Sequence, residues 1–459
     1  MTNTLDFSRV HQFSSNGDQL ILDINSGSLH LLDSESASFL TWLQNKNLPY
    51  QEATKLYLNE QPQKPASAEI LQELEELIRE ELLFSPPLPF PDKLPQSWIK
   101  SLCLNICHDC NLRCKYCFAG TGNFGGQRLL MPLEIACQAI DLLLRESGPR
   151  LFCELDFFGG EPLLNFEVVQ KAYYYGKEAA QKAGKQLKFT LTTNGYALDE
   201  ATLAWLNQEN ISLVLSHDGR PHIHDAMRRL PDGSGSHAKV AANLNKAAAS
   251  RPNGNYFIRG TYSSNNLDFV EDILFWLNQG YQYLSLEPAI TESQAAWRLT
   301  NEHLPRLSQE YHDLARLCYQ RFQEGRPFQF FHYNLDLTKA PCLAKRLWGC
   351  GAGYEYIAVT PEGDIYPCHQ FVGNEDFILG NVATGFNNKQ LGKEFKAAHI
   401  YHKPACRNCW ARYFCSGGCH ANNYHASGDL LIPHQLSCDL FKIRLEAGLW
   451  LNSKIIRHG

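Results

Sequence analysis

The chain has 459 residues, enough for about three domains, and a formal net charge of -6 at neutral pH. This balance offers no overall basic field for nucleic acid, and 44% hydrophobic with 20% charged residues is typical of a soluble globular protein. The sequence shows no apolar stretch of membrane-spanning length and no signal-peptide pattern at its start. We therefore predict a cytoplasmic protein without a membrane or nucleic-acid partner, whose 16 cysteines are metal ligands or buried thiols.

Residues 1–84 alternate short apolar runs with turns and then become helical. The turns Asn16-Gly17-Asp18 and Asn25-Ser26-Gly27 predict two β-hairpins. The predicted strands are 10–13, 20–24 and 29–32, and the predicted helices are 34–45 and 67–83. Residues 85–98 begin with a run too rich in proline for a helix or a central strand, which predicts a semi-rigid linker.

Residues 99–300 alternate strand-like runs with helical stretches such as 132–146 and 165–183. The predicted strands are 102–106, 151–158, 187–193, 211–216, 256–262 and 283–287. This α/β pattern predicts a parallel sheet with crossover helices, and six repeats rather than eight favour an open, partial (β/α)6 barrel. Functional residues of such a sheet are expected at the carboxyl ends of its strands.

Three cysteines follow the first of these strands, at Cys110, Cys114 and Cys117. Three thiols in so short a loop cannot all form disulfides with each other. Their spacing suits three ligands of a [4Fe-4S] cluster, which leaves one iron without a protein ligand. The alternative is a structural zinc knuckle that recruits His108 or Asp109 as its fourth ligand.

This loop resembles the motif of the radical S-adenosylmethionine (SAM) superfamily, including Tyr116 just before the third cysteine. The resemblance implies that the open iron binds the amino and carboxyl groups of SAM. It also implies that an electron, from a donor such as flavodoxin or ferredoxin, cleaves SAM to a 5'-deoxyadenosyl radical.

Three further motifs follow later strands of the predicted barrel. Gly159-Gly160-Glu161-Pro162 resembles the family's GGEP motif, in which the glutamate holds the SAM amino group. Asn194 follows the third strand. Ser216 and Arg228 match family residues that contact the SAM carboxylate or ribose, with Arg229 as a competitor for the second role.

Residues 301–340 are predicted to be a bridging helical region with a long amphipathic helix at 302–326, and residues 341–459 hold a second set of cysteines. These thiols are Cys342, Cys350, Cys368, Cys406, Cys409, Cys415, Cys419 and Cys438. Their order resembles the SPASM domain of peptide-modifying radical SAM enzymes, and eight thiolates saturate two [4Fe-4S] clusters.

The family arrangement implies one auxiliary cluster on Cys342, Cys350, Cys368 and Cys419 and the other on Cys406, Cys409, Cys415 and Cys438. With the SAM-binding cluster, this makes three. Cys342 is the least secure ligand, because some relatives leave an open iron at that position. A pair of zinc ribbons is the alternative.

The remaining cysteines have apolar sequence neighbours. Cys103, Cys137, Cys153 and Cys318 are therefore predicted to be core residues. Cys107 lies closer to the first cysteine loop, but the three-ligand motif is complete without it.

The N-terminal module resembles the PqqD-like winged-helix elements of enzymes that modify ribosomally made peptides. Such modules bind a leader peptide as an added strand, and a plain structural cap is the alternative. The sequences of residues 107–117 and 349–382 are similar to those of maturases of SCIFF peptides, which are small and rich in cysteine.

The implied reaction joins a cysteine sulfur to a carbon of the same peptide. Sulfatase maturases carry an aspartate after the cysteine matching Cys368, where this chain has His369. Sulfatase or quinohaemoprotein maturation is the alternative enzymatic function, and a non-catalytic, metal-stabilised peptide-binding scaffold is the alternative outside enzymes.

Overall fold

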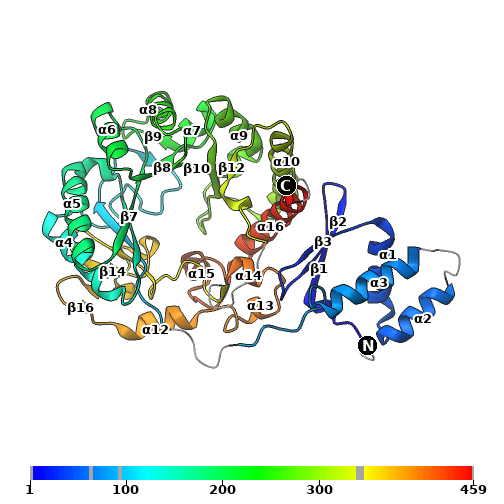
Figure 1. Ribbon diagram of the computed structural model, residues 1–459. Coiled ribbons are helices and arrows are strands. Elements are labelled where there is room, and N and C mark those ends of the chain that lie inside the picture. Colours follow the sequence, from blue (N-terminus) through cyan, green and yellow to red (C-terminus); the bar gives the residue numbers. More distant parts are fainter. Residues whose placement is uncertain (1–3, 61–65, 91–95, 338–345, 457–459) are drawn as a thin grey trace.

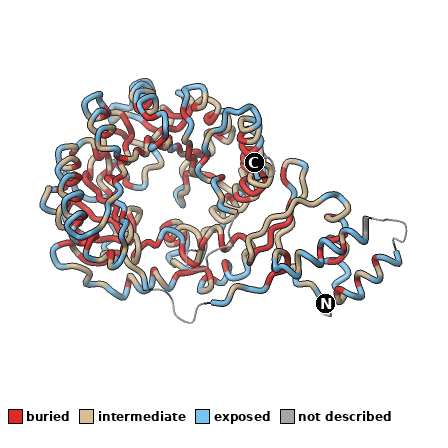
Figure 2. Tube along the Cα trace, viewed as in Figure 1, coloured by how far each residue is buried: buried red, intermediate tan, exposed pale blue. Residues whose placement is uncertain are grey.

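The computed structural model describes residues 4–60, 66–90, 96–337 and 346–456 (Figure 1). An N-terminal module, a large mixed sheet with its helices, and a cysteine-rich C-terminal part follow each other along the chain. Within the described residues, no helix is both long enough and apolar enough to cross a membrane. Figure 2 shows the buried residues gathered in the strands and on the inward faces of the surrounding helices.

The N-terminal module contains a three-stranded antiparallel sheet in the order β1-β2-β3. Its elements are β1 (Val10–Ser15), β2 (Asp18–Asp23), β3 (Leu29–Leu32), α1 (Ser34–Lys46), α2 (Tyr50–Glu60) and α3 (Ala66–Arg79). Both predicted hairpins are confirmed. Asn16 and Gly17 take the positive φ angles, 49° and 87°, that a two-residue hairpin turn requires.

Two differences from the predicted helices have local causes. The second predicted helix ends at Arg79 instead of residue 83, because Glu81 and Phe84 adopt positive φ angles of 56° and 54°. Helix α2 was not predicted, because its buried side chains are an alanine and two tyrosines among polar neighbours and not an aliphatic stripe.

The central sheet is built on six parallel strands that correspond to the six predicted ones. They are β4 (Ser101–Cys107), β6 (Phe152–Gly159), β7 (Gln186–Thr193), β8 (Ser212–Ser216), β10 (Tyr256–Tyr262) and β11 (Tyr283–Pro288). They pair in chain order, which confirms the parallel topology. The described sheet ends at β12 (Gln329–Phe330) on one side and β16 (Gly385–Phe386) on the other, and its interpretation as a partial barrel stays a prediction.

Helices connect these strands, as crossover connections of a parallel sheet require. They are α4 (Leu133–Glu146), α5 (Phe166–Lys182), α6 (Glu200–Gln208), α7 (Pro221–Met227), α8 (His237–Ala249), α9 (Phe269–Asn278) and α10 (Leu304–Gln323). Cys103 and Cys153 in the strands and Cys318 in α10 are buried as predicted, whereas Cys137 on α4 is only partly buried.

The C-terminal part extends the same sheet, since β13 (Tyr356–Val359) pairs in parallel with β4. The other elements are β14 (Asp364–Tyr366), β15 (Gly380–Asn381), α12 (Lys389–Ala397), α13 (Pro404–Arg407), α14 (Arg412–Cys415), α15 (His420–Ser427) and α16 (Gln435–Ile456). Helix α16, drawn in red in Figure 1, packs against α10 and also contacts the N-terminal sheet.

The N-terminal module is docked through side chains of β1 and β2. The His11 ring stacks on Trp410 with their centroids 3.7 Å apart, and His11 Nε2 lies 2.8 Å from Glu446 Oε1. Trp450 Nε1 donates to Asp18 Oδ2 at 2.7 Å. Among the described residues, strand β3 at the other end of the sheet is hydrogen-bonded to β2 and to no other strand.

Candidate active site and cluster-binding cysteines

The candidate active site lies at the carboxyl ends of the neighbouring strands β4, β6, β7 and β8. The loop with Cys110, Cys114 and Cys117 follows β4, and Gly160-Glu161 follows β6. Asn194 follows β7, and Ser216 is the last residue of β8. Because the strands are parallel, the fold brings these sequence-predicted residues to one edge of the sheet.

The three thiols of the first loop are held near each other by backbone contacts. Strand β5 (Arg113–Cys114) pairs with β9 (Arg228–Arg229), and Cys117 N donates to Cys114 O at 3.1 Å. Burial raises the pKa of Cys110 to about 12, and the Cys114 and Cys117 thiols add to this shift. The loop thus presents three clustered sulfur ligands, the donor set that the predicted [4Fe-4S] cluster requires.

Of the two side chains that a zinc knuckle would recruit, Asp109 has polar partners, whereas the buried Nε2 atom of His108 has no hydrogen-bond partner among the described residues. The His108 ring packs on Phe124 at a centroid distance of 4.7 Å. Asp109 forms an ion pair with Arg128 at 2.5 Å and accepts a hydrogen bond from Cys110 N. Cys107 donates through its thiol to Asp109 O at 3.2 Å. Asp109 is thus engaged by other groups, and the choice between an iron-sulfur cluster and a zinc site stays a prediction.

The cysteine loop rests directly on the Gly159-Gly160 turn. A Cβ atom on Gly159 would lie 2.4 Å from Cys107 O, and one on Gly160 would lie 2.1 Å from Asp109 O. Gly160 N donates to Cys107 O at 2.7 Å, and Glu161 N donates to Asp109 O at 2.8 Å. Glycine is required here because any side chain would push the two loops apart.

The Glu161 carboxylate is fully buried beside this loop. It accepts hydrogen bonds from Leu163 N at 3.1 Å, Thr193 Oγ1 at 2.7 Å and Asn194 N at 2.8 Å. Burial raises its pKa to about 7, against the effect of these hydrogen bonds. The structure therefore presents an oriented carboxylate, as a contact to an ammonium group requires, and the contact to SAM stays a prediction.

Asn194 also faces the cysteine loop. Its Nδ2 donates to Asn111 Oδ1 at 2.7 Å and lies 3.7 Å from Cys110 Sγ. The side chain therefore links the end of β7 to a predicted cluster ligand.

The structure adds Asp218, whose role the sequence did not reveal. This fully buried carboxylate accepts a hydrogen bond from Tyr116 Oη, and Arg228 Nε lies 3.0 Å from its Oδ2 atom. The Arg228 guanidinium also lies 5.4 Å from the centre of the Tyr116 ring and lowers the pKa of Cys114 against the effect of burial. Asp218 thereby joins two predicted site residues into one network beside the cysteine loop.

The structure also bears on the predictions made for Arg228, Arg229 and Ser216. Arg229 is exposed, so Arg228 is the arginine that faces the site. Ser216 lies opposite Arg259 in the pairing of β8 with β10. The proposed contacts of Ser216 and Arg228 with SAM stay predictions.

Several of the C-terminal thiols lie close together, and their assignment to two ligand sets stays a prediction. Cys368 lies close enough to Cys419 and Cys350 for both to raise its pKa, which burial raises most. Burial raises the pKa of Cys415 to about 11, and the nearby Cys406 and Cys409 thiols contribute to this shift. Cys415 and Cys409 in turn raise the pKa of Cys438. Cys342 lies outside the described residues.

His369 brings the C-terminal part to the candidate active site. Its Nδ1 lies 2.8 Å from Tyr356 Oη, and its ring packs against both Phe118, which follows Cys117, and Phe158. Burial lowers its pKa to about 4, and Arg259 adds to this shift. The residue after Cys368 is therefore a neutral imidazole at neutral pH.

Comparison with known families agrees with this geometry. Residues 104–275 match the Radical SAM superfamily, and residues 350–410 match the SPASM iron-sulfur cluster-binding domain. The cysteine-type anaerobic sulfatase-maturating enzyme of Clostridium novyi (strain NT) is 24% identical over 340 residues, which cover 68% of this chain and 86% of that protein.

Two solved structures share the fold. Native anSMEcpe with bound AdoMet superposes with a TM-score of 0.66 at 20% identity, covering 78% of this chain and 100% of that one. Streptococcus suis SuiB bound to precursor peptide SuiA superposes with a TM-score of 0.52 at 16% identity, covering 95% of this chain and 99% of that one.

The fold and the site define a radical SAM protein with a C-terminal SPASM domain. The chain is a radical SAM/SPASM protein. The two domains imply that it binds SAM and [4Fe-4S] clusters.

We predict that Gly160→Ala weakens SAM binding at least tenfold, about 1.4 kcal/mol, because its Cβ would displace the Asp109 carbonyl. Gly126→Ala is the matched control, since a Cβ there meets its nearest atom at 3.6 Å. Anaerobic equilibrium binding of SAM to both variants checks this. Equal affinities would contradict the required close approach.

We also predict that Asp218→Asn destabilises the protein by about 3 to 5 kcal/mol, because it leaves the buried Arg228 guanidinium without its carboxylate. Arg229→Gln, next in sequence but exposed, is expected to change stability by less than about 0.5 kcal/mol. Chemical denaturation of the two variants measures the difference, and similar unfolding midpoints would show that the pair is dispensable.

Proposed function

We propose that this chain forms intramolecular thioether cross-links, from cysteine sulfur to carbon, in a ribosomally made, Cys-rich precursor peptide. The proposal extends the radical SAM/SPASM assignment and the similarity of residues 107–117 and 349–382 to SCIFF-peptide maturases. Peptide recognition is the part that the structure supports most directly, through a groove in the N-terminal module.

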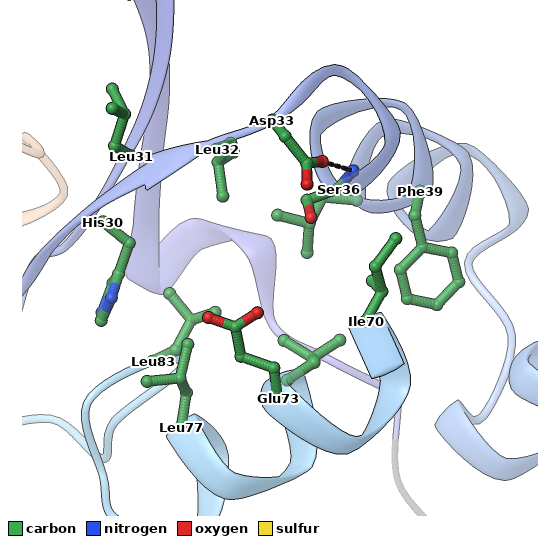
Figure 3. A pocket seen from close by; sticks show the side chains of 12 residues that line it. His30, Leu31, Leu32, Asp33, Ser36, Phe39, Ile70, Glu73, Leu77 and Leu83 are labelled. Atoms are coloured by element: carbon green, nitrogen blue, oxygen red, sulfur yellow. Dashed lines mark hydrogen bonds between the residues drawn. The ribbon is translucent and has the colours of Figure 1, made fainter. Parts of the chain in front are cut away.

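The groove lies between β3 and α3 and has a volume of about 360 Å³. Figure 3 shows Ile70, Glu73 and Leu77 of α3 on one side and His30 and Leu32 of β3 on the other. The complete lining is His30, Leu31, Leu32, Asp33, Ser36, Phe39, Leu40, Ile70, Glu73, Leu74, Leu77 and Leu83.

A groove of this kind suits an extended leader peptide. Strand β3 is the end strand of its sheet, so its outer backbone groups are available to a fourth strand. Alternate side chains of that strand would enter the apolar lining. The Glu73 carboxylate, which Figure 3 shows among these apolar side chains, favours a leader with a basic residue at this point.

In this proposal the rest of the chain positions the reacting groups. Cys110, Cys114 and Cys117 hold the SAM-binding cluster, and Glu161 orients the SAM amino group. SAM and its cluster, when bound, supply the radical that abstracts a hydrogen atom from a peptide carbon. A peptide cysteine then bonds to that carbon, losing its proton and leaving one surplus electron. The C-terminal thiols would hold two auxiliary clusters, which would supply an acceptor for that electron. The peptide loses two hydrogens per cross-link.

Sulfatase maturation is the second candidate function, because the Clostridium novyi relative is a sulfatase-maturating enzyme. His369 argues against it, because the neutral imidazole stands where those enzymes carry an aspartate. Quinohaemoprotein maturation is a third candidate enzymatic function. SAM cleavage on reduction is expected for all three enzymatic functions and not for a non-catalytic metal scaffold.

Co-expression with a short Cys-rich peptide encoded beside this chain tests the proposed function. Mass spectrometry is expected to show a loss of two hydrogens for each cross-link, with the sulfur bonded to carbon. Oxidation of a sulfatase cysteine without a new sulfur-carbon bond would establish the second candidate instead.

We predict that Cys114→Ala abolishes 5'-deoxyadenosine formation and lowers the iron content by about four atoms per chain, from about twelve. The auxiliary iron is expected to remain, because those thiols belong to other loops. Cys137→Ala, at a partly buried position on α4, is the control and should keep all of the iron. Retained SAM cleavage in Cys114→Ala would refute the assignment of the first loop.

We predict that Leu77→Asp weakens binding of a full-length precursor peptide at least tenfold, because it places a charge in the apolar groove. Leu58→Asp, on α2 outside the groove and 41% exposed in the native protein, is the matched control. Fluorescence anisotropy with labelled peptide measures affinity, while peptide-independent SAM cleavage should stay unchanged in both. Unchanged affinity in Leu77→Asp would place the leader elsewhere.

A further inference from the structure

Lys403 is a fully buried lysine in the C-terminal part of the chain. Its side chain is among the largest with no solvent exposure, and it precedes the first residue of α13. Burying an ammonium group is costly unless negative groups compensate it. The structure gives Nζ one hydrogen bond, to Gly417 O at 2.7 Å, although an ammonium carries three donors.

The position of Lys403 relates it to both sets of C-terminal thiols. Gly417 lies between Cys415 of one set and Cys419 of the other, and a Cβ on Gly417 would lie 3.3 Å from Lys403 Nζ. Burial lowers the pKa of Lys403, and nearby thiols oppose this shift: Cys406, Cys415 and Cys438 from one set and Cys419 from the other. One buried cation thus faces both candidate cluster sites.

We propose that Lys403 is a positioning residue whose buried positive charge is shared by the two auxiliary clusters and raises the reduction potential of both. This inference depends on the cluster assignment made under the proposed function. A thiolate-bound [4Fe-4S] cluster carries net negative charge, which grows by one on reduction. A cation fixed nearby in a low-dielectric interior therefore stabilises the reduced form more than the oxidised form.

Lys442 on α16 provides a matched comparison. Burial raises the pKa of Cys406 and Cys438, and the Lys442 charge opposes this shift. Both thiols belong to one set. The Lys442 side chain is 34% exposed and lies 3.7 Å from Asp439, so solvent and this carboxylate screen its charge. The two lysines therefore differ in burial and in the number of candidate clusters they reach.

The test uses the full-length holoprotein, prepared anaerobically, with redox titration of each cluster monitored by electron paramagnetic resonance. Lys403→Met is expected to lower the potentials of both auxiliary clusters by at least a tenfold change in the reduction equilibrium constant, or ~59 mV for one electron. Lys403→Arg should retain both potentials to a large extent. Lys442→Met should shift one cluster by a smaller amount, and the SAM-binding cluster should be unaffected throughout.

Wild-type potentials for both auxiliary clusters in Lys403→Met, or a shift of one alone, would overturn the inference. If Lys403→Met loses both clusters while Lys403→Arg keeps them, the requirement for the charge is supported. Loss in both variants would show that packing, and not charge, is what matters. Absence of auxiliary iron from the wild-type protein would overturn the cluster assignment itself. A failure of the Lys403 inference, by contrast, would be seen only in the variants.

Discussion

The close approach of two backbone segments governs the candidate active site. The carbonyl groups of Cys107 and Asp109 accept hydrogen bonds from the turn after β6, at distances that leave no room for a Cβ atom on Gly159 or Gly160. This contact fixes the cysteine loop against Glu161, so the sulfur ligands and the buried carboxylate keep one relative position. A site that binds one ligand through both a metal and a carboxylate requires this rigidity.

Buried charge completes the same site. Asp218, Tyr116 and Arg228 come from three segments, and the two charged groups, Asp218 and Arg228, are buried. Because unpaired buried charges are costly, these groups hold one another in place and with them the β5–β9 pairing on which Cys114 lies. The network thus links the electrostatics of the site to the geometry of the loop.

The sequence predicted the six parallel strands and both hairpins, because strand periodicity and turn residues are local signals. Cysteine spacing is also a local signal, and the sulfur ligand sets that it indicates stay a prediction. It did not predict Asp218, whose partners lie 102 and 10 residues away, or the burial of Lys403. Helix α2 lacked an apolar stripe, and the pairing of β13 with β4 joins segments more than 250 residues apart. These features arise from tertiary contacts, which a local pattern does not encode.

The docking of the N-terminal module gives its peptide groove a fixed relation to the thiols. His11 stacks on Trp410, the residue after Cys409, while β3 at the far side of the sheet borders the groove. A peptide added at β3 would therefore bind a module already held against the C-terminal thiols. Under the proposed function, a module that is already docked would leave more of the leader's binding energy available to hold the reacting part of the peptide near SAM.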